Sequence, residues 1–308
     1  MHVVVLGAGA IGSLVAGSLA AADEGAAAGA SVTLLGRDGE HERRVRERGL
    51  RFERPDGSET TVDVAATSDR AAAARADLLV VCVKSYDTAE ALAGVAPHLD
   101  DAEVLTLQNG LGNAETVAER VPDERVVVGT TSHGAVLEGP GHLRHAGRGD
   151  TTVGRWFAAN DDRVRETAAL LSAAGIETAV TDDPERAVWA KVLVNLGVNA
   201  PTALARVRNG ALVDEPAGRR LLEGAVAEGV AVAEVCGVDA PEDAVERTRT
   251  VARRTATNRS SMRQDLEAGG RTEVEALYGE VARRAAAHDV DAPVTRTLAD
   301  LLRLAESE

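Results

Sequence analysis

The chain has 308 residues, of which 44% are hydrophobic, and its 49 acidic and 34 basic side chains give a formal net charge of −15. This acid excess repels nucleic acid and anionic lipid at long range, and with only two residues each of Trp, Tyr and Phe a stacking surface for single-stranded bases is disfavoured too. No apolar run approaches the roughly 20 residues of a membrane span, so we expect a cytoplasmic protein without membrane or nucleic-acid partners. An acidic composition with almost no lysine is also typical of adaptation to high salt.

A glycine motif directly follows the first predicted strand. The strand covers His2–Leu6, and GAGAIG then gives the GxGxxG spacing before a helical pattern over residues 11–22. Glycines at this spacing allow a tight turn and a close approach to a pyrophosphate, whose charge the helix N-terminus favours. We therefore predict that a dinucleotide binds at Gly7, Ala8, Gly9, Ala10, Ile11 and Gly12.

The second predicted strand, at residues 31–35, carries information about the cofactor. It follows a lengthened Ala/Gly loop at residues 23–30 and ends in Gly36, Arg37 and Asp38. An acid at this strand end accepts hydrogen bonds from the ribose hydroxyls of NAD(H), whereas an arginine accommodates the 2′-phosphate of NADP(H). Because Arg37 precedes Asp38, the sequence favours NADP(H) and leaves NAD(H) open. The alternative for Arg37 is an ordinary surface charge.

Two further predicted strands end in polar residues. After a helix at 40–48 and a polar hairpin at 50–64, the buried strand at 77–83 is followed by Lys84, and the strand at 103–107 leads to Asn109. Ligands in parallel sheets bind beyond the carboxyl ends of the strands, so both residues are candidates for cofactor contact. The alternatives are a solvated lysine and a plain Asn-Gly turn.

The rest of the first half completes a sheet domain. We predict a strand at 125–129, an antiparallel hairpin within 130–154, a helix at 163–174 and a strand at 177–181. The hairpin contains His133, His142 and His145, but no carboxylate or thiol stands at ligand spacing, so we predict no metal site.

From residue 182 onward only helical periodicity is found. The predicted helices cover residues 184–200, 215–236, 241–254, 271–288 and 293–305. The sequence therefore predicts an α/β protein with a Rossmann-type doubly wound sheet at 1–181 and an all-helical substrate or catalytic domain at 182–308. Whether the chain forms a homodimer is left open.

The first helix of the second half carries an unusual polar stripe. Lys191, Asn195 and Asn199 follow one another at intervals of four residues, which places them on successive turns of one helix face. The other helices are solvated by Glu, Asp and Arg, and Lys84 and Lys191 are the only lysines in the chain. An ammonium, unlike a guanidinium, can release a proton near neutral pH when it is partly desolvated. Lys191 is therefore the candidate general acid. The alternative is that the stripe is the solvent-exposed polar face of an ordinary amphipathic helix.

Two later segments contain further candidate site residues. Ser260 and Ser261 precede a helical run and could either cap it or hold a carboxylate. Glu273 is predicted at the beginning of a helix, where an acid on the surface would complement the helix dipole.

With these features together, the sequence resembles the 2-dehydropantoate 2-reductase, or ketopantoate reductase, family. The resemblance runs nearly end to end and is most specific in WAKVLVNLGVNAPTALARVRNG, SSMRQD and RTEVEALYG. It implies the reduction of a small 2-oxo acid, 2-dehydropantoate, to (R)-pantoate by NADPH, a step toward pantothenate and coenzyme A, with Lys191 as proton donor. It further implies substrate binding by Asn109, Asn195, Asn199, Asn209 and Ser261, and cofactor-side contacts from Lys84, Asn109, Ala135 and Glu273.

The chemistry of the residues agrees with this resemblance. A 2-oxo acid that accepts hydride develops negative charge on its carbonyl oxygen, which a nearby ammonium can stabilise and then protonate. Two other hypotheses stay open: a related two-domain dehydrogenase acting on another 2-oxo acid or an opine, and a non-catalytic NADP(H) sensor. The lysine in an apolar helix argues against the sensor.

Overall fold

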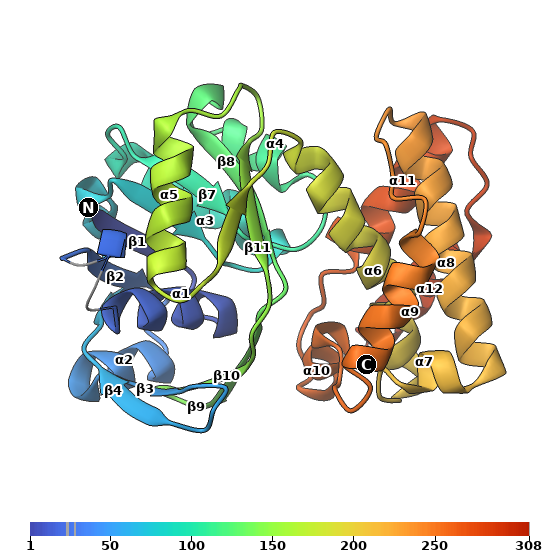
Figure 1. The fold of residues 1–308 in the computed structure, drawn as a ribbon, viewed down its shortest axis with the longest axis horizontal. Coiled ribbons are helices and arrows are strands. Elements are labelled where there is room, and N and C mark those ends of the chain that lie inside the picture. The colour runs from blue at the N-terminus through green and yellow to red at the C-terminus, as the bar shows by residue number, and fades with distance from the viewer. Residues whose placement is uncertain (23–24, 28, 308) are drawn as a thin grey trace. The chain divides into compact units, whose positions relative to one another are not determined.

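The computed structural model describes residues 1–22, 25–27 and 29–307, and the chain divides into two compact units. The first unit comprises Met1–Gln108 and Asn113–Pro184, and the second comprises Asn109–Gly112 and Glu185–Glu308. Three residues of the loop predicted at 23–30, namely 23, 24 and 28, lie outside the described part of the chain. Figure 1 colours the chain from blue at the N-terminus to red at the C-terminus and labels many of its helices and strands.

The first unit is built on an eight-stranded sheet. In spatial order its strands are β12 (Thr178–Val180), β11 (Thr151–Arg155), β8 (Val126–Thr131), β7 (Glu103–Thr106), β6 (Leu78–Val81), β1 (His2–Leu6), β2 (Ser31–Leu35) and β5 (Ala65–Thr67). The strands from β8 to β5 are parallel, whereas β11 pairs antiparallel with β8. The order β5-β2-β1-β6-β7-β8 is that of a Rossmann-type sheet. The predicted fold class is confirmed for this half of the chain.

Helices cover both faces of this sheet. The helices α1 (Ala10–Ala20) and α5 (Asp162–Ala173) bury Leu14 and Leu171 in one cluster with Val3 and Val5 of β1. Successive side chains of a strand alternate between faces, so Val4 points to the opposite side. On the sheet's other flank, α4 (Asn113–Ala118) contacts β7, β8 and α3 (Thr88–Val95). Full burial of such side chains contributes about 1.5–3 kcal/mol each, so the strand sequences themselves stabilise this core.

A second, four-stranded sheet belongs to the same unit. Its strands lie in the order β4 (Glu59–Val62), β3 (Leu50–Glu53), β10 (His142–Gly147) and β9 (Gly134–Gly139). The two hairpins β3–β4 and β9–β10 were predicted, but the parallel pairing of β10 with β3 that joins them was not. Alternating side chains predict each hairpin, whereas the choice of partner edge depends on tertiary packing of residues such as Phe52 and Leu143.

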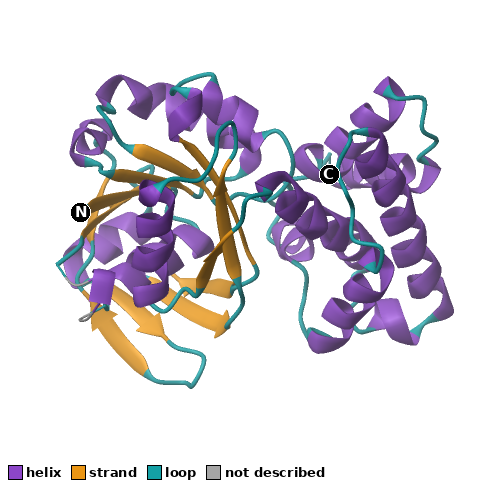
Figure 2. Cartoon of the chain, turned by 45° about the horizontal axis from the view of Figure 1, so that its top comes forward, coloured by secondary structure: helices purple, strands orange, loops and turns teal. Residues whose placement is uncertain are grey.

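The second unit consists of helices. Its helices are α6 (Pro184–Ala205), α7 (Ala211–Asp214), α8 (Pro216–Val235), α9 (Ala244–Arg254), α10 (Ser261–Glu267), the π-helix η6 (Glu275–Gly279), α11 (Glu280–Ala287) and α12 (Pro293–Ala305). Among the described residues, all strands lie in the first unit, as the orange arrows of Figure 2 show. None of the helices described is both long and apolar enough to span a membrane.

The helix α6 differs from its prediction at the carboxyl end. A helix ending at residue 200 was expected, but α6 continues through Pro201 to Ala205. A proline inside a helix lacks the N–H of one ladder bond and its ring crowds the carbonyl of the preceding turn. Tertiary contacts therefore sustain the last turns of α6.

Two glycines fix the rotation of α6 about its axis. A Cβ atom at Gly197 would lie 2.7 Å from the Thr248 side chain of α9, and one at Gly229 of α8 would lie 2.7 Å from Leu193 and Leu196 of α6. Such close approaches lock the buried face of α6 against its neighbours. The direction of the stripe formed by Lys191, Asn195 and Asn199 is consequently fixed as well.

Candidate active site

The glycine motif of the first unit has the geometry of a nucleotide loop. Gly7 has φ +113°, and a Cβ there would lie 2.6 Å from the backbone of Val83. A Cβ at Gly12 would lie 1.9 Å from the Gly7 carbonyl oxygen, whereas one at Gly9 would meet nothing within 4 Å. Gly7 and Gly12 are therefore required for the turn and for helix–strand packing, while Gly9 leaves open space before the N-terminus of α1. This arrangement fits a pyrophosphate, whose charge the first N–H groups of α1 would favour.

Arg37 and Asp38 are placed differently at the end of β2. The Asp38 backbone has φ 63°, and its carboxylate accepts a hydrogen bond of 2.6 Å from Arg46 of α2 (Glu40–Arg48). The Arg37 side chain is 90% exposed, with its guanidinium 3.6 Å from the Asp87 carboxylate. Buried Glu42 holds this turn because its carboxylate accepts the Arg37 backbone N–H at 2.9 Å. Both side chains are thus in surface ion pairs, and the pair of Arg37 is the longer and more exposed of the two.

Lys84 and Ala135 occupy other parts of the first unit. Lys84 follows β6 and precedes a short 3-10 helix at Ser85–Asp87. The adjoining segment is braced by Gln108, whose amide donates to the Val83 carbonyl at 2.7 Å. Ala135 lies on β9, half-buried against the main core of the unit.

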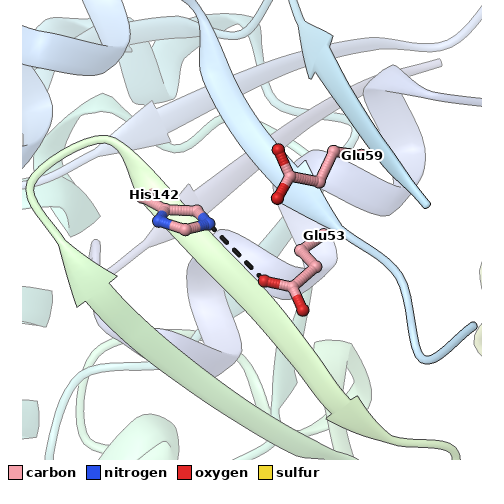
Figure 3. A group of neighbouring side chains, drawn as sticks. All are labelled: Glu53, Glu59 and His142. Atoms are coloured by element: carbon pink, nitrogen blue, oxygen red, sulfur yellow. Dashed lines mark ion pairs between the residues drawn. The ribbon is translucent and has the colours of Figure 1, made fainter. Parts of the chain in front are cut away.

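His142 lies beside two carboxylates that its position in the sequence did not reveal. Glu53, Glu59 and His142 offer ligand atoms within 4.8 Å of one another, as drawn in Figure 3. They meet because β10 pairs with β3 and β3 pairs with β4. The Glu59 carboxylate accepts hydrogen bonds of 2.7–2.9 Å from the fork of Arg51, and His142 forms an ion pair of 3.7 Å with Glu53. These side chains therefore form a network of charged and polar groups at the surface.

The predicted acid lies in the second unit, in a half-buried position on α6. Burial lowers the pKa of Lys191 from its ordinary 10.5 to about 8, and the negative charge of Glu273 opposes this by raising it. An amine with this pKa is largely protonated at neutral pH and can still release its proton. Glu273 is only 7% exposed and lies on the turn before the π-helix η6. Of the interpretations of Glu273, the alternative of a surface acid at a helix start is therefore excluded, because Glu273 is buried and its charge acts on Lys191.

Asn109 joins this group through a loop that belongs to the second unit. Its side-chain amide donates a hydrogen bond of 3.2 Å to the Glu273 carboxylate. The loop is fixed two residues later, where the Leu111 N–H donates to the Ala276 carbonyl at 2.8 Å. Gly110 has φ +92° and lies so close to Ala276 that a Cβ would come within 2.5 Å of its carbonyl oxygen. A side chain at position 110 would therefore displace Asn109 from Glu273.

The remaining substrate candidates lie near the carboxyl end of α6. Asn199 is buried, and one turn later the Thr202 hydroxyl contacts the Ser260 hydroxyl at 2.8 Å. Ser260 caps α10 by accepting the Arg263 N–H at 3.2 Å, which leaves the neighbouring Ser261 exposed at the first helical position. Of the two alternatives for this pair, capping is therefore the role of Ser260.

Asn209 is held beside the same segment. Its side-chain amide donates to the Thr255 hydroxyl at 2.9 Å, and its backbone N–H donates to the Asn258 carbonyl at 3.1 Å. The amide oxygen of Asn209 is buried, and within the described residues it has no hydrogen-bond partner. A buried polar atom without a partner is costly, so this oxygen is suited to accept a hydrogen bond from a bound hydroxyl group.

Tyr278 is the residue of this region that sequence reasoning missed. It is fully buried, and its hydroxyl contacts the backbone of α6 between Asn195 and Ala200. The only signal in the sequence was rarity, since the chain contains two tyrosines. Rarity alone does not distinguish a core residue from one that shapes a site.

Family models match both halves of the chain. Residues 3–157 match the family described as ketopantoate reductase PanE/ApbA, and residues 183–306 match its C-terminal counterpart. A protein of Halobacterium salinarum named 2-dehydropantoate 2-reductase is 57% identical over 308 residues, which cover 100% of both chains.

Solved structures match along the same length. A PanE/ApbA family ketopantoate reductase from Ralstonia eutropha superimposes with a TM-score of 0.90 at 34% identity, covering 100% of this chain and 99% of the other. A D-mandelate dehydrogenase with NADH and anilino(oxo)acetate superimposes with a TM-score of 0.93 at 23% identity, with the same coverage. The second likeness concerns the fold alone.

Proposed function

Because the chain belongs to the ketopantoate reductase PanE/ApbA family, we propose that it is an enzyme that reduces 2-dehydropantoate to (R)-pantoate with NADPH. The observation that carries the proposal is the grouping of Lys191, Glu273 and Asn109 within one unit, from segments far apart in the sequence. The 57% identity to a 2-dehydropantoate 2-reductase along the whole chain supports the choice of substrate. The product would enter pantothenate and coenzyme A synthesis.

The proposal assigns cofactor binding to one half of the chain and substrate binding to the other. Residues 1–181 bind NADPH through the glycine motif, with Arg37 on the 2′-phosphate and Lys84 and Ala135 as further contacts. Bound NADPH supplies the hydride. Residues 182–308 bind the 2-oxo acid and provide the proton. Asn109 is assigned to both ligands, and Glu273 to the cofactor and to the charge of Lys191. The end of β2 supports NADPH over NADH, because Asp38 is held by Arg46 at 2.6 Å, whereas Arg37 is 90% exposed and its pair with Asp87 spans 3.6 Å.

Lys191 is the proton donor in the proposed reaction. Its ammonium stabilises the negative charge that develops on the carbonyl oxygen of the substrate and then donates the proton that completes the alcohol. Glu273 keeps the amine protonated against the effect of burial. Asn195, Asn199, Asn209 and Ser261 hold the carboxylate and the distal hydroxyl of the substrate by hydrogen bonds that add no charge.

The direct test is an assay of NADPH oxidation by the purified chain with 2-dehydropantoate. The assay should be run in dilute and in molar salt, because a net charge of −15 produces a self-repulsion that salt screens. We expect 2-dehydropantoate to be preferred over 2-oxo acids without a distal hydroxyl and over aromatic 2-oxo acids. Preference for one of those other substrates would favour the alternative hypothesis, a related two-domain dehydrogenase acting on another 2-oxo acid. Tight NADPH binding without oxidation in either salt would instead indicate a sensor.

Replacing Arg37 by alanine should change cofactor preference. A charge-assisted hydrogen bond is worth about 1.5–3 kcal/mol, so Arg37→Ala should raise the KM for NADPH about 10- to 100-fold and leave the KM for NADH unchanged. Steady-state kinetics with both cofactors measure this directly. Arg48→Ala, an exposed arginine in the last turn of α2, changes the net charge equally and serves as the control. Equal losses with NADPH and NADH would contradict the role of Arg37.

A further inference from the structure

The phenol hydroxyl of Tyr278 forms hydrogen bonds with the backbone of α6. Its hydroxyl accepts the N–H of Ala200 at 2.8 Å and lies 2.7 Å from the carbonyl oxygen of Leu196 and 3.0 Å from that of Asn195. Leu196 and Ala200 are the two ends of one i, i+4 pair in the helical ladder. The side chain is fully buried, and burial raises the pKa of Tyr278, so the hydroxyl keeps the proton with which it donates.

The contact between Tyr278 and α6 falls on the turn that joins two of the candidate substrate-binding asparagines. It lies between Asn195 and Asn199, one turn beyond Lys191, and immediately before Pro201. A proline disfavours the helical conformation of the residue before it and removes a ladder bond, so it loosens the turn that precedes it. A side chain inserted into the ladder at such a turn bends the helix. Pro201 and the Tyr278 hydroxyl therefore act on the same turn of α6, the one that leads from Asn195 to Asn199.

The element that carries Tyr278 also positions the other polar groups of the site. Tyr278 lies in the π-helix η6, where the Gly279 N–H bonds the Val274 carbonyl five residues earlier at 2.9 Å. Glu273 lies two residues before this segment, and the Ala276 carbonyl within it accepts the N–H of Leu111 in the Asn109 loop at 2.8 Å. π-Helices are rare and are found frequently at functional sites.

We propose that Tyr278 is a positioning residue, whose hydroxyl holds the turn between Asn195 and Asn199 in the conformation that binds the 2-oxo acid. The proposal rests on the proposed function, because it assigns the purpose of that turn to substrate binding. Tyr278 does not touch substrate in this account. It acts through the backbone of α6.

Tyr278→Phe tests the proposal because it removes one oxygen atom and keeps the ring. Misplacement of binding groups by about an ångström can cost 100-fold, so we expect kcat/KM for 2-dehydropantoate to fall about 10- to 100-fold, chiefly through KM. The affinity for NADPH should be unchanged. Thr248→Val is the matched control, since it removes another buried hydroxyl, which donates to the Ala244 carbonyl within α9 at 2.8 Å, and keeps the methyl group that packs against α6 at Gly197. We expect its KM to equal that of the wild type.

A second variant keeps the test decisive if Tyr278→Phe does not fold. In Tyr278→Phe with Pro201→Ala, residue 201 regains an N–H and the turn can close as a regular α-helix, which restores a ladder bond without restoring the hydroxyl contact of Tyr278. The proposal expects this folded double variant to keep the raised KM. A wild-type KM in either folded variant, or an equal rise in Thr248→Val, would overturn it. Wild-type protein without any reduction of 2-dehydropantoate would instead refute the proposed function.

Discussion

Lys191→Ala is expected to lower kcat for 2-dehydropantoate about 100- to 10,000-fold, the range typical of a lost general acid. The variant should bind NADPH as the wild type does, because the glycine motif and Arg37 belong to the other unit of the chain. Steady-state kinetics with NADPH titration separate the two effects. A turnover near that of the wild type would contradict the assignment of Lys191.

Two further replacements isolate the property of Lys191 that the reaction requires. Lys191→Met keeps the apolar stem and removes the amine, whereas Lys191→Arg keeps the charge on a group that does not release its proton near neutral pH. We expect both variants to lose most of the activity. Recovery of turnover by Lys191→Arg would show that charge alone suffices, without proton donation.

Stability provides an independent control on these variants. The pKa of Lys191 falls in the folded state from 10.5 to about 8, so the unfolded chain binds this proton more tightly. The charged amine therefore opposes folding at neutral pH, and this cost disappears as pH rises through the window from about 8 to 10.5. Lys191→Met should consequently unfold at an equal or higher temperature than the wild type at pH 7. An inactive but stable variant locates the defect in the chemistry.

The sequence predicts those parts of the molecule that local patterns determine. The strand at residues 31–35 and the helix at 293–305 have the predicted bounds, because their apolar periodicity and end signals are local. The stripe of Lys191, Asn195 and Asn199 could likewise be predicted, since it requires only a helix. The roles of these residues in catalysis stay predictions.

Features created by contacts between distant segments could not be predicted in this way. The pairing of β10 with β3 brings His142 to Glu53, and nothing in either hairpin specifies that partner. The sequence left open whether Glu273 is a surface acid at a helix start or a residue of the site, and the fold decides this by burying it. The contact of Tyr278 with α6 joins residues more than 80 positions apart in the sequence, as its bond to Leu196 shows. Helical periodicity carries no information about such a bond.

The second large effect is expected in the pH dependence of kcat when the charge of Glu273 is removed. The protonated form of Lys191 is the acid, so wild-type kcat should be constant at neutral pH and fall as pH rises through about 8. The Glu273 carboxylate raises this pKa, and Glu273→Gln should therefore move the alkaline limb of the profile to lower pH. The wild-type amine is about half protonated at pH 8, and a fall of its pKa by one to two units lowers the acid form there about 5- to 50-fold, so we expect a loss of that size at pH 8 that largely disappears in mild acid.

The glutamine variant is informative because its amide oxygen can still accept the hydrogen bond from Asn109, which spans 3.2 Å in the wild type. Glu275→Gln is the matched control: it removes one negative charge two residues away, from a carboxylate that pairs at the surface with Arg303. Its pH profile should follow that of the wild type. If Glu273→Gln lost activity equally at every pH, the carboxylate would serve to bind substrate or to order the Asn109 loop. A shift confined to the alkaline limb would instead mean that Glu273 acts on the reaction through the proton of Lys191.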